Sequence, residues 1–320
     1  MSTKKLLAPL LLLTLVAGLL GCSKDDASLG SNSQIFTLKK LFENLATTPQ
    51  VFMVSAGQTQ TITGASGTRI TFRPQSFKDA SGAIITSGTI KIELVEIYKP
   101  NEMIANRVNT VTPTQLLTSG GSVHIKATQG NNEVQANSYK IEFKQPAYSG
   151  NPMALFKGAP LSAEDPTIIW GNDTSGTVRN TVKDTASENL FFYAFDTCTS
   201  FNWINCDYFY NSPGTKTDVS LVATDSTFNR NNTQVFVVFP AINSVASMYT
   251  YNTTTHTFSF GMPGYFIPVG SSIHIVIISA KNNSYYMDVQ KNITVTNGMS
   301  LNYTPALTTQ AGVRDALQNL

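Results

Sequence analysis

Short segments in which apolar and polar residues alternate dominate the chain from about residue 51 onwards. The clearest is Thr89–Tyr98, in which we expect Ile90, Ile92 and Leu94 to face inward and Lys91, Glu93 and Val95 to face outward. A period of two is typical of a strand with one buried face, because successive side chains of a strand point to opposite sides. Turn signals rich in Gly, Asn and Asp recur at roughly 8–12-residue spacing. The pattern therefore predicts a mainly β protein.

Two groups of such segments lie on either side of a stretch rich in Gly, Pro, Ala and Ser. The further strands that we predict are Gln58–Thr63, Thr68–Arg73, Ser122–Thr128, Tyr139–Phe143, Asn189–Phe195, Phe201–Cys206, Thr217–Val222, Val235–Phe239, Ile273–Ile278 and Lys291–Val295. Many short strands separated by turns favour sandwiches over an α/β fold. We predict two β-sandwich-like domains, residues 34–147 and 167–304, joined by a linker over residues 148–166. A short strand over Met153–Lys157 is an alternative within the linker.

The chain also contains two short segments with helical periodicity. Apolar residues recur at near-helical spacing over residues 35–45, after a candidate N-cap at Ser33. The tail, residues 305–320, shows the same spacing after candidate caps at Thr308 or Thr309. We therefore expect one short helix near the N-terminus of the mature chain and one at the C-terminus.

The first residues have the features of a secretion signal. Lys4 and Lys5 precede the uncharged segment Leu6–Leu20, which is shorter than the roughly 20 residues of a membrane span. Its last two residues and the two that follow read Leu19-Leu20-Gly21-Cys22. This is the pattern of a lipobox, whose cysteine accepts the lipid. We predict a signal peptide over residues 1–21 and lipidation of Cys22. An ordinary signal peptide followed by a chance cysteine is the alternative.

Residues 22–33 have the composition of a flexible tether. Ser23 follows the cysteine, whereas an Asp in that place retains lipoproteins in the inner membrane under the familiar sorting rule. The triplet Lys24-Asp25-Asp26 resembles the export signal of surface-exposed lipoproteins in the Bacteroidetes phylum. We therefore expect lipid anchoring in the outer membrane with the domains at the cell surface. A solvated tether without a sorting role is the alternative.

The charge, cysteine and histidine content limits the kinds of partner and bound group that we expect. Only 13% of the residues are charged, and without Lys4 and Lys5 the basic and acidic residues balance. No basic cluster is present, which argues against nucleic acid as a partner. Cys198 and Cys206 form a candidate disulfide in an oxidising compartment, and the sequence leaves open whether they bond. The three histidines, His124, His256 and His274, are scattered, so we expect neither a metal site nor a cofactor. His124 and His274 lie in alternating segments, and we expect both to face outward from a strand.

The motifs of common enzymes are missing from the sequence. It has no Gly-x-Ser-x-Gly elbow, no His-Glu-x-x-His zinc motif and no phosphate-binding loop. We expect no enzymatic activity, although two carboxylates distant in sequence remain a possibility. The aromatic residues Trp170, Trp203, Tyr208 and Tyr210 are candidates for a ligand-binding surface. Core packing of these rings is the alternative.

Two stretches carry a resemblance to a known group. They are Gly67–Phe77, with Gly82 and Gly88 beyond it, and Trp203-Ile204-Asn205-Cys206-Asp207. Together they resemble a group of uncharacterised Bacteroidetes lipoproteins with paired β-domains, and the first stretch is distantly similar to the ZU5 type of β-module. The resemblance implies location and fold but no activity.

The expected function is that of a non-catalytic binding or scaffold module that contacts a glycan or another envelope protein. A purely structural envelope protein is the alternative, and a hydrolase with a non-local carboxylate pair is a third interpretation.

Overall fold

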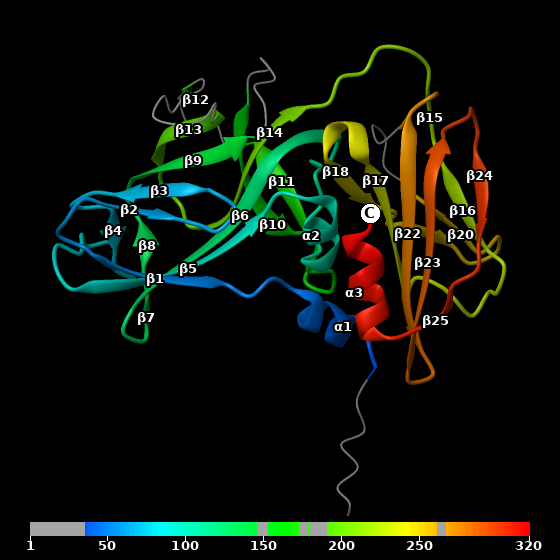
Figure 1. Cartoon of the computed structure of the whole chain (residues 1–320), viewed down its shortest axis with the longest axis horizontal. Helices are drawn as coiled ribbons and strands as arrows, with labels where there is room; N and C mark the ends of the chain where they lie inside the picture. The colour runs from blue at the N-terminus through cyan, green and yellow to red at the C-terminus, as the bar shows by residue number, and fades with distance from the viewer. Residues whose placement is uncertain (1–35, 146–152, 173–177, 180–190, 261–266) are drawn as a thin grey trace, which may run out of the picture. The chain divides into compact units, whose positions relative to one another are not determined.

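The computed structural model describes residues 36–145, 153–172, 178–179, 191–260 and 267–320 (Figure 1). Residues 35–320 form one compact unit. The predicted signal peptide, Cys22, the triplet that follows Ser23, and the tether lie outside the described residues and stay predictions. The described residues are mainly β, with two β-sandwich-like halves and three short helices, which confirms the predicted fold class.

The first sandwich consists of two antiparallel sheets. In one sheet the order is β1 (Gln50–Ser55), β5 (Thr89–Ile97), β6 (Leu117–Gln129), β14 (Asn202–Phe209), β10 (Ala154–Pro160) and β11 (Ile168–Asn172), and β7 (Asn132–Glu133) also pairs with β6. The facing sheet has the order β12 (Val178–Arg179), β13 (Phe191–Cys198), β9 (Tyr139–Gln145), β3 (Arg69–Phe72) and β2 (Gln60–Thr63). A small pair, β4 (Phe77–Lys78) and β8 (Gln135–Ala136), lies outside both sheets.

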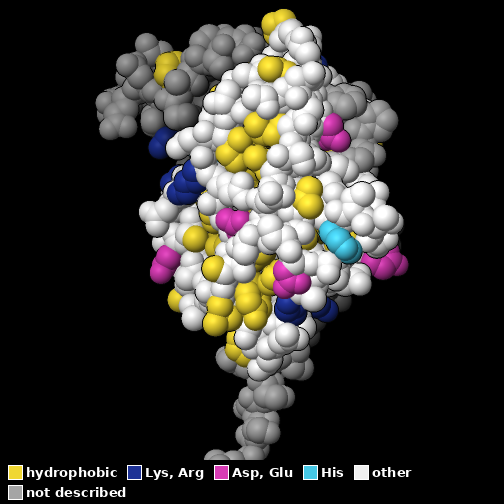
Figure 2. All heavy atoms as spheres, turned by 90° about the vertical axis from the view of Figure 1, so that its right-hand side faces the viewer, with side chains coloured by type: hydrophobic (Ala, Val, Ile, Leu, Met, Phe, Trp, Pro, Cys, Tyr) yellow, Lys and Arg dark blue, Asp and Glu magenta, His cyan; other side chains and the backbone are white. Residues whose placement is uncertain are grey.

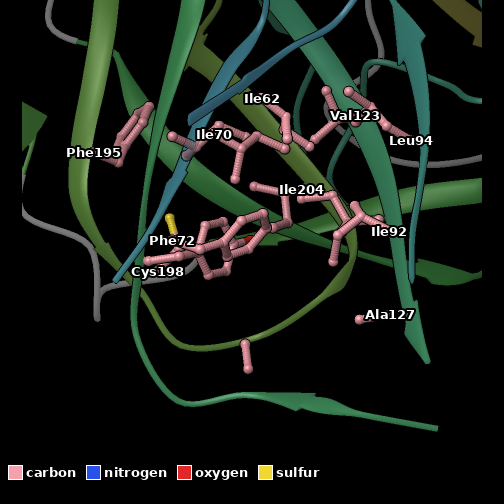
Figure 3. Close-up of a cluster of buried hydrophobic side chains, with 14 of the residues drawn as sticks. Ile62, Ile70, Phe72, Ile92, Leu94, Val123, Ala127, Phe195, Cys198 and Ile204 are labelled. Carbon is pink, nitrogen blue, oxygen red and sulfur yellow. The ribbon is translucent and has the colours of Figure 1, made fainter. Parts of the chain in front are cut away.

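Alternate residues of these strands fill the space between the two sheets. Ile70 and Phe72 of β3 belong to one buried cluster with Ile92 and Leu94 of β5 (Figure 3). All four side chains are fully buried. The period-two pattern therefore predicts correctly that Ile90, Ile92 and Leu94 of β5 face inward.

The second sandwich has the same kind of construction. One sheet has the order β18 (Ser244–Ser247), β17 (Thr233–Phe239), β22 (Ser272–Lys281), β23 (Ser284–Thr294) and β25 (Ala306–Thr308). The other has the order β19 (Thr250–Asn252), β20 (Thr257–Ser259), β16 (Ser220–Ala223) and β24 (Ser300–Tyr303), in which β16 and β24 run parallel. β15 (Lys216–Thr217) pairs with β21 (Ile267–Pro268), and a 3-10 turn, η1 (Pro240–Ile242), joins β17 to β18.

The boundary between the sandwiches differs from the predicted one. β14 pairs with β6, β13 pairs with β9, and β10 pairs with β14, so all three strands complete the first sandwich. Residues 154–160, predicted as part of a linker, are a strand. Gly158 serves close packing there, because a Cβ would lie 2.6 Å from the Cβ of Trp203. The Gly- and Pro-rich composition marks a crowded strand and a hairpin rather than a domain boundary.

Three helices lie at the junction of the two sandwiches: α1 (Leu38–Leu45), α2 (Pro100–Ala105) and α3 (Gln310–Gln318). Thr37 caps α1, where Ser33 was predicted, and Thr309 caps α3 as one of the two predicted alternatives. Arg314 of α3 donates a hydrogen bond to the carbonyl oxygen of Asn44 at 2.7 Å. Among the described helices, none has the length and apolar character to cross a membrane.

A third hydrophobic core holds the two sandwiches together. Phe42 of α1 and Leu317 of α3 pack in it with Ile97 of the first sandwich and Phe236 of the second. The outward face of the first sheet is thus covered, which explains why Val95, predicted to face outward, is buried. His274 was also predicted to face solvent, but it is buried and its Nδ1 accepts a hydrogen bond from the amide of Asn292. The alternation of residues along a strand does not predict which side chains are exposed where both faces of the sheet are buried.

Candidate ligand-binding site

The four predicted aromatic residues do not form one surface. Trp170 is fully buried and donates its indole N–H to the carbonyl oxygen of Asn109, so its assignment to an exposed platform is wrong. Trp203 is half-buried against the ring of His124, with 4.8 Å between ring centroids. Tyr208 packs against the first core, and Tyr210 packs against the core of the second sandwich, which includes Leu221 and Phe258. None of the four lines any of the three cavities that the described residues enclose most clearly.

The two cysteines lie on facing sheets of the first sandwich. Cys198 of β13 and Cys206 of β14 are both buried in the first core and are thiols in the structure, rather than a disulfide. Burial, together with the neighbouring Asp207, raises the pKa of the Cys206 thiol. Since the thiolate is the reactive form, Cys206 is poorly suited to act as a nucleophile.

Asp207 follows Cys206 and is a fully buried carboxyl group. It accepts hydrogen bonds from the amide of Gly120 at 3.2 Å and from the side-chain amide of Asn205. Burial raises its pKa to about 8, because the low-dielectric surroundings disfavour the charged form more than these hydrogen bonds favour it. The side-chain oxygen Oδ1 of Asn205 is buried and has no hydrogen-bond partner among the described residues.

One cavity of about 370 Å³ lies in the first sandwich, beside the β6–β7 hairpin. Its lining includes the buried core residues Ile125 and Val134, and also His124. Burial lowers the pKa of His124, so the imidazole is mostly neutral at pH 7. The only aromatic side chain in its described lining besides His124 is Phe201, which packs on the core rings of Phe72 and Tyr139.

A larger cleft of about 500 Å³ lies in the second sandwich, between the β16–β17 connection and the β19–β20 hairpin. Its described lining consists of Ser226, Asn229, Arg230, Asn231, Tyr249, Tyr251, Thr253 and His256. The volume is within the roughly 300–1,000 Å³ typical of small-ligand sites. We call this set of residues the tyrosine cleft.

The two tyrosine rings of the cleft are held in fixed positions. Tyr249 and Tyr251 are two residues apart, which places them on one side of an extended segment. The hydroxyl of Tyr249 accepts a hydrogen bond from the side-chain amide of Asn109, and the ring of Tyr251 lies 4.7 Å from that of Phe258. The hydroxyl of Tyr251 is 3.3 Å from Nδ1 of His256. Both rings are half-buried, so part of each remains accessible to a ligand.

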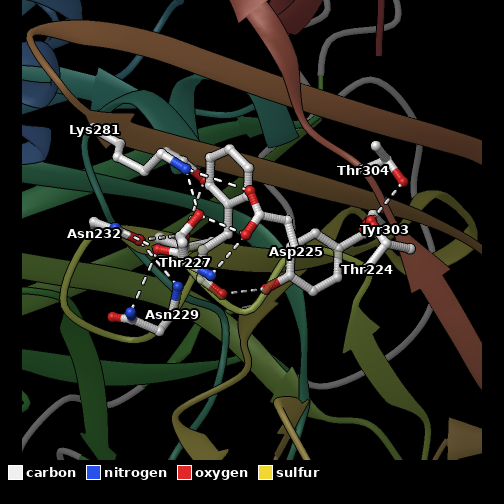
Figure 4. Close-up of polar contacts among 11 residues, drawn as sticks. Thr224, Asp225, Thr227, Asn229, Asn232, Lys281, Tyr303 and Thr304 are labelled. Carbon is white, nitrogen blue, oxygen red and sulfur yellow. Dashed lines mark hydrogen bonds and ion pairs between the residues drawn. The ribbon is translucent and has the colours of Figure 1, made fainter.

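The opposite wall of the cleft is a loop braced by its own side chains (Figure 4). The amide of Asn229 donates to the side-chain oxygen of Asn232 at 3.0 Å, and the side-chain oxygen of Asn229 accepts from the amide of Asn231 at 3.0 Å. The amide of Thr227 donates to Asp225 at 2.9 Å. Such Asx-type turns fix a loop locally, so its polar groups are preorganised.

The first sandwich contributes an ion pair to this wall. Arg230 donates to Asp165, in the β10–β11 hairpin, at 2.7 Å. Burial alone would raise the pKa of Asp165, but hydrogen bonds from Thr167 and Arg230 outweigh it and hold the pKa below its ordinary value. Asp165 is therefore ionised at pH 7 and neutralises the guanidinium that lines the cleft.

From the sequence alone, the asparagine-rich turn at residues 229–232 indicates either a hydrogen-bonding loop or ordinary β-turn chemistry, and Tyr249 and Tyr251 are missed. The spacing Tyr-x-Tyr before a turn was the available signal, since it places two rings on one side of a strand.

Comparison with protein-family models gave no match, and a search of curated proteins gave none either. The group of three or more His, Cys, Asp or Glu side chains that a metal ion would need does not occur among the described residues.

Proposed function

We propose that this chain is a surface-exposed lipoprotein, anchored in the outer membrane through Cys22, whose folded unit is a non-catalytic binding module. The lipobox before Cys22, the serine at position 23 and the acidic triplet that follows support the location. A glycan or another envelope protein is the proposed partner.

The tyrosine cleft carries the proposal for binding. It combines two accessible aromatic rings with a rigid polar wall, the combination found in sites that orient a ligand by stacking and hydrogen bonds. Hydrolysis of a glycosidic bond by the usual mechanism requires two carboxyl groups on either side of it. The described lining of the tyrosine cleft contains no carboxylate. The lining of the cavity in the first sandwich contains one, Glu133, and that of a third cavity contains one, Glu102. This favours binding over the hydrolase alternative.

Photocrosslinking on intact cells tests this function. A benzophenone amino acid at Thr253, an exposed residue of the cleft, should give a reproducible crosslinked product with a glycan or an envelope protein. The same probe at Thr89, an exposed residue of the first sandwich, serves as the matched control. Equal product at both positions, or none at Thr253, would refute the assignment and favour the purely structural alternative.

Protease accessibility on intact cells tests the location. The wild-type chain should be digested, whereas a variant with Ala at Lys24, Asp25 and Asp26 should be protected. Protection of both chains would place the folded unit in the periplasm and contradict surface exposure.

A further inference from the structure

We infer that the tyrosine cleft takes an uncharged saccharide, and that Asp165 sets this specificity by neutralising Arg230. The inference rests on the proposed binding function and names the chemical class of the ligand. It follows from three features of the cleft: its rings, its neutral polar groups and its paired charges.

The rings of Tyr249 and Tyr251 both line the cleft and bring aromatic, largely apolar surface to it. A pyranose ring has an apolar face of C–H groups and an edge of hydroxyl groups. The face can pack on a half-buried tyrosine ring, while the edge remains free for hydrogen bonds. The contacts of Tyr251 with Phe258 and His256 hold that ring in place before a ligand binds, which reduces the entropy lost on binding.

The polar groups that remain available in the cleft are neutral. The side chains of Ser226, Asn231 and Thr253 make no hydrogen bond within the described part of the chain, and all three are exposed. Hydroxyl and amide groups can both donate and accept, as can the hydroxyl groups of a sugar. Asn231 is held by the hydrogen bond from its backbone amide to Asn229, so its side chain starts from a fixed point.

The cationic groups at the cleft are already neutralised. Arg230 is the single Lys or Arg in the described lining, and Asp165 binds it at 2.7 Å. Lys281, at the base of the same loop, pairs with Asp225 at 3.4 Å and lies 4.2 Å from the centre of the Phe228 ring. An anionic ligand would place its charge near the ionised Asp165, which is unfavourable. On the face of the second sandwich in Figure 2, charged side chains are few and scattered among neutral ones.

The first experiment measures binding of the full, lipidated chain in detergent to immobilised oligosaccharides, each neutral one matched with a uronic-acid or sulfated counterpart. The wild-type chain should bind a neutral member and discriminate against its acidic counterpart. Tyr251→Ala should weaken that binding by about tenfold or more, because a stacking surface is lost. Phe209→Ala, which removes an exposed ring outside the cleft, is the matched control and should not weaken it.

The second experiment tests the charge. Asp165→Asn should leave Arg230 unpaired and raise the affinity for the acidic counterpart by about tenfold. Asp225→Asn removes the other carboxylate of the region, whose partner Lys281 does not line the cleft, and should give no such gain. The double variant Asp165→Asn, Arg230→Gln should lose the gain. Because the double variant also lacks the ion pair, it separates the effect of the Arg230 charge on binding from the effect of losing that pair on stability.

The outcomes separate this inference from the proposed function. Binding of acidic saccharides by the wild-type chain as tightly as neutral ones, with dependence on Tyr251, overturns the inference and leaves the binding module standing. Crosslinking of a protein at Thr253 with no saccharide bound also overturns the inference alone. Absence of both saccharide binding and crosslinks at Thr253 overturns the two together.

Discussion

Replacement of the buried Asp207 should change how the stability of the chain depends on pH. In the folded chain its pKa is about 8, whereas an unfolded Asp has a pKa of about 3.9. Between these values the folded state binds a proton that the unfolded state has released. Stability is therefore greatest below pH 4 with respect to this group, and it is lost as the pH rises towards 8. The loss is about 1.4 kcal/mol per pH unit, or roughly 4 kcal/mol between pH 4 and pH 7.

Asp207→Asn keeps the shape of the side chain and removes the titration. The amide oxygen of the new residue can accept from Gly120, as Oδ1 of Asp207 does. Its NH₂ group can donate to the Asn205 side-chain oxygen, which has no partner among the described residues, after that amide rotates. The variant should thus be close to wild type in stability near pH 4 and increasingly more stable than wild type as the pH rises towards 8.

Urea unfolding of the purified chain at half-unit steps from pH 4.5 to pH 8 measures the effect. The difference between variant and wild type should rise steadily with pH, and subtracting the two curves removes the contribution of all other titrating groups. Glu133→Gln, which removes an exposed carboxylate, is the control and should follow wild type. A constant difference across the whole range would refute the reasoning, because it would mean that Asp207 titrates alike in the folded and unfolded states.

Three further predictions concern packing, capping and anchoring. Gly158→Ala should destabilise the chain by roughly 1–3 kcal/mol in urea unfolding, because the new methyl group meets Trp203 and Trp170. If the variant is as stable as wild type, β10 can move away from its neighbours at no cost and the reasoning is wrong. Thr309→Ala should cost about 1 kcal/mol by the same assay, since the hydroxyl accepts from Gly312 at 3.0 Å. Cys22→Ser should give an unlipidated precursor on metabolic labelling with palmitate; continued label incorporation would contradict the lipobox.

Local patterning was sufficient for most strands and for the first core. Ile70, Phe72 and Ile92 were identifiable because a strand with one wet face shows its buried side in every second residue. The same logic failed for Val95, since the second face of that strand is covered by the other sandwich. The short helix α2 was missed although Pro100 and Glu102 occupy positions typical of a helix start.

The candidate site and the division into sandwiches depend on contacts between distant parts of the sequence. Arg230 and Asp165 are 65 positions apart, and Tyr249 and Asn109 are 140 apart. No local periodicity encodes which strands complete which sheet, so β13 and β14 were assigned to the wrong half. The sequence allows either a ligand-binding surface or core packing for the aromatic residues between positions 191 and 210. Most of the described rings there are buried in a core or packed against one, as expected of large apolar side chains.

The contact between α1 and α3 bears on how the folded unit would respond to mechanical force. A chain held by a lipid at Cys22 is pulled through the segment that leads into α1. That helix is not an isolated handle, because Phe42 is embedded in the core shared by both sandwiches and Asn44 is tied to Arg314 of the last helix. Tension on α1 would therefore load this shared core and the contact with the last helix together. The proposed anchor would thus pull on the part of the fold in which both sandwiches and the first and last described helices meet.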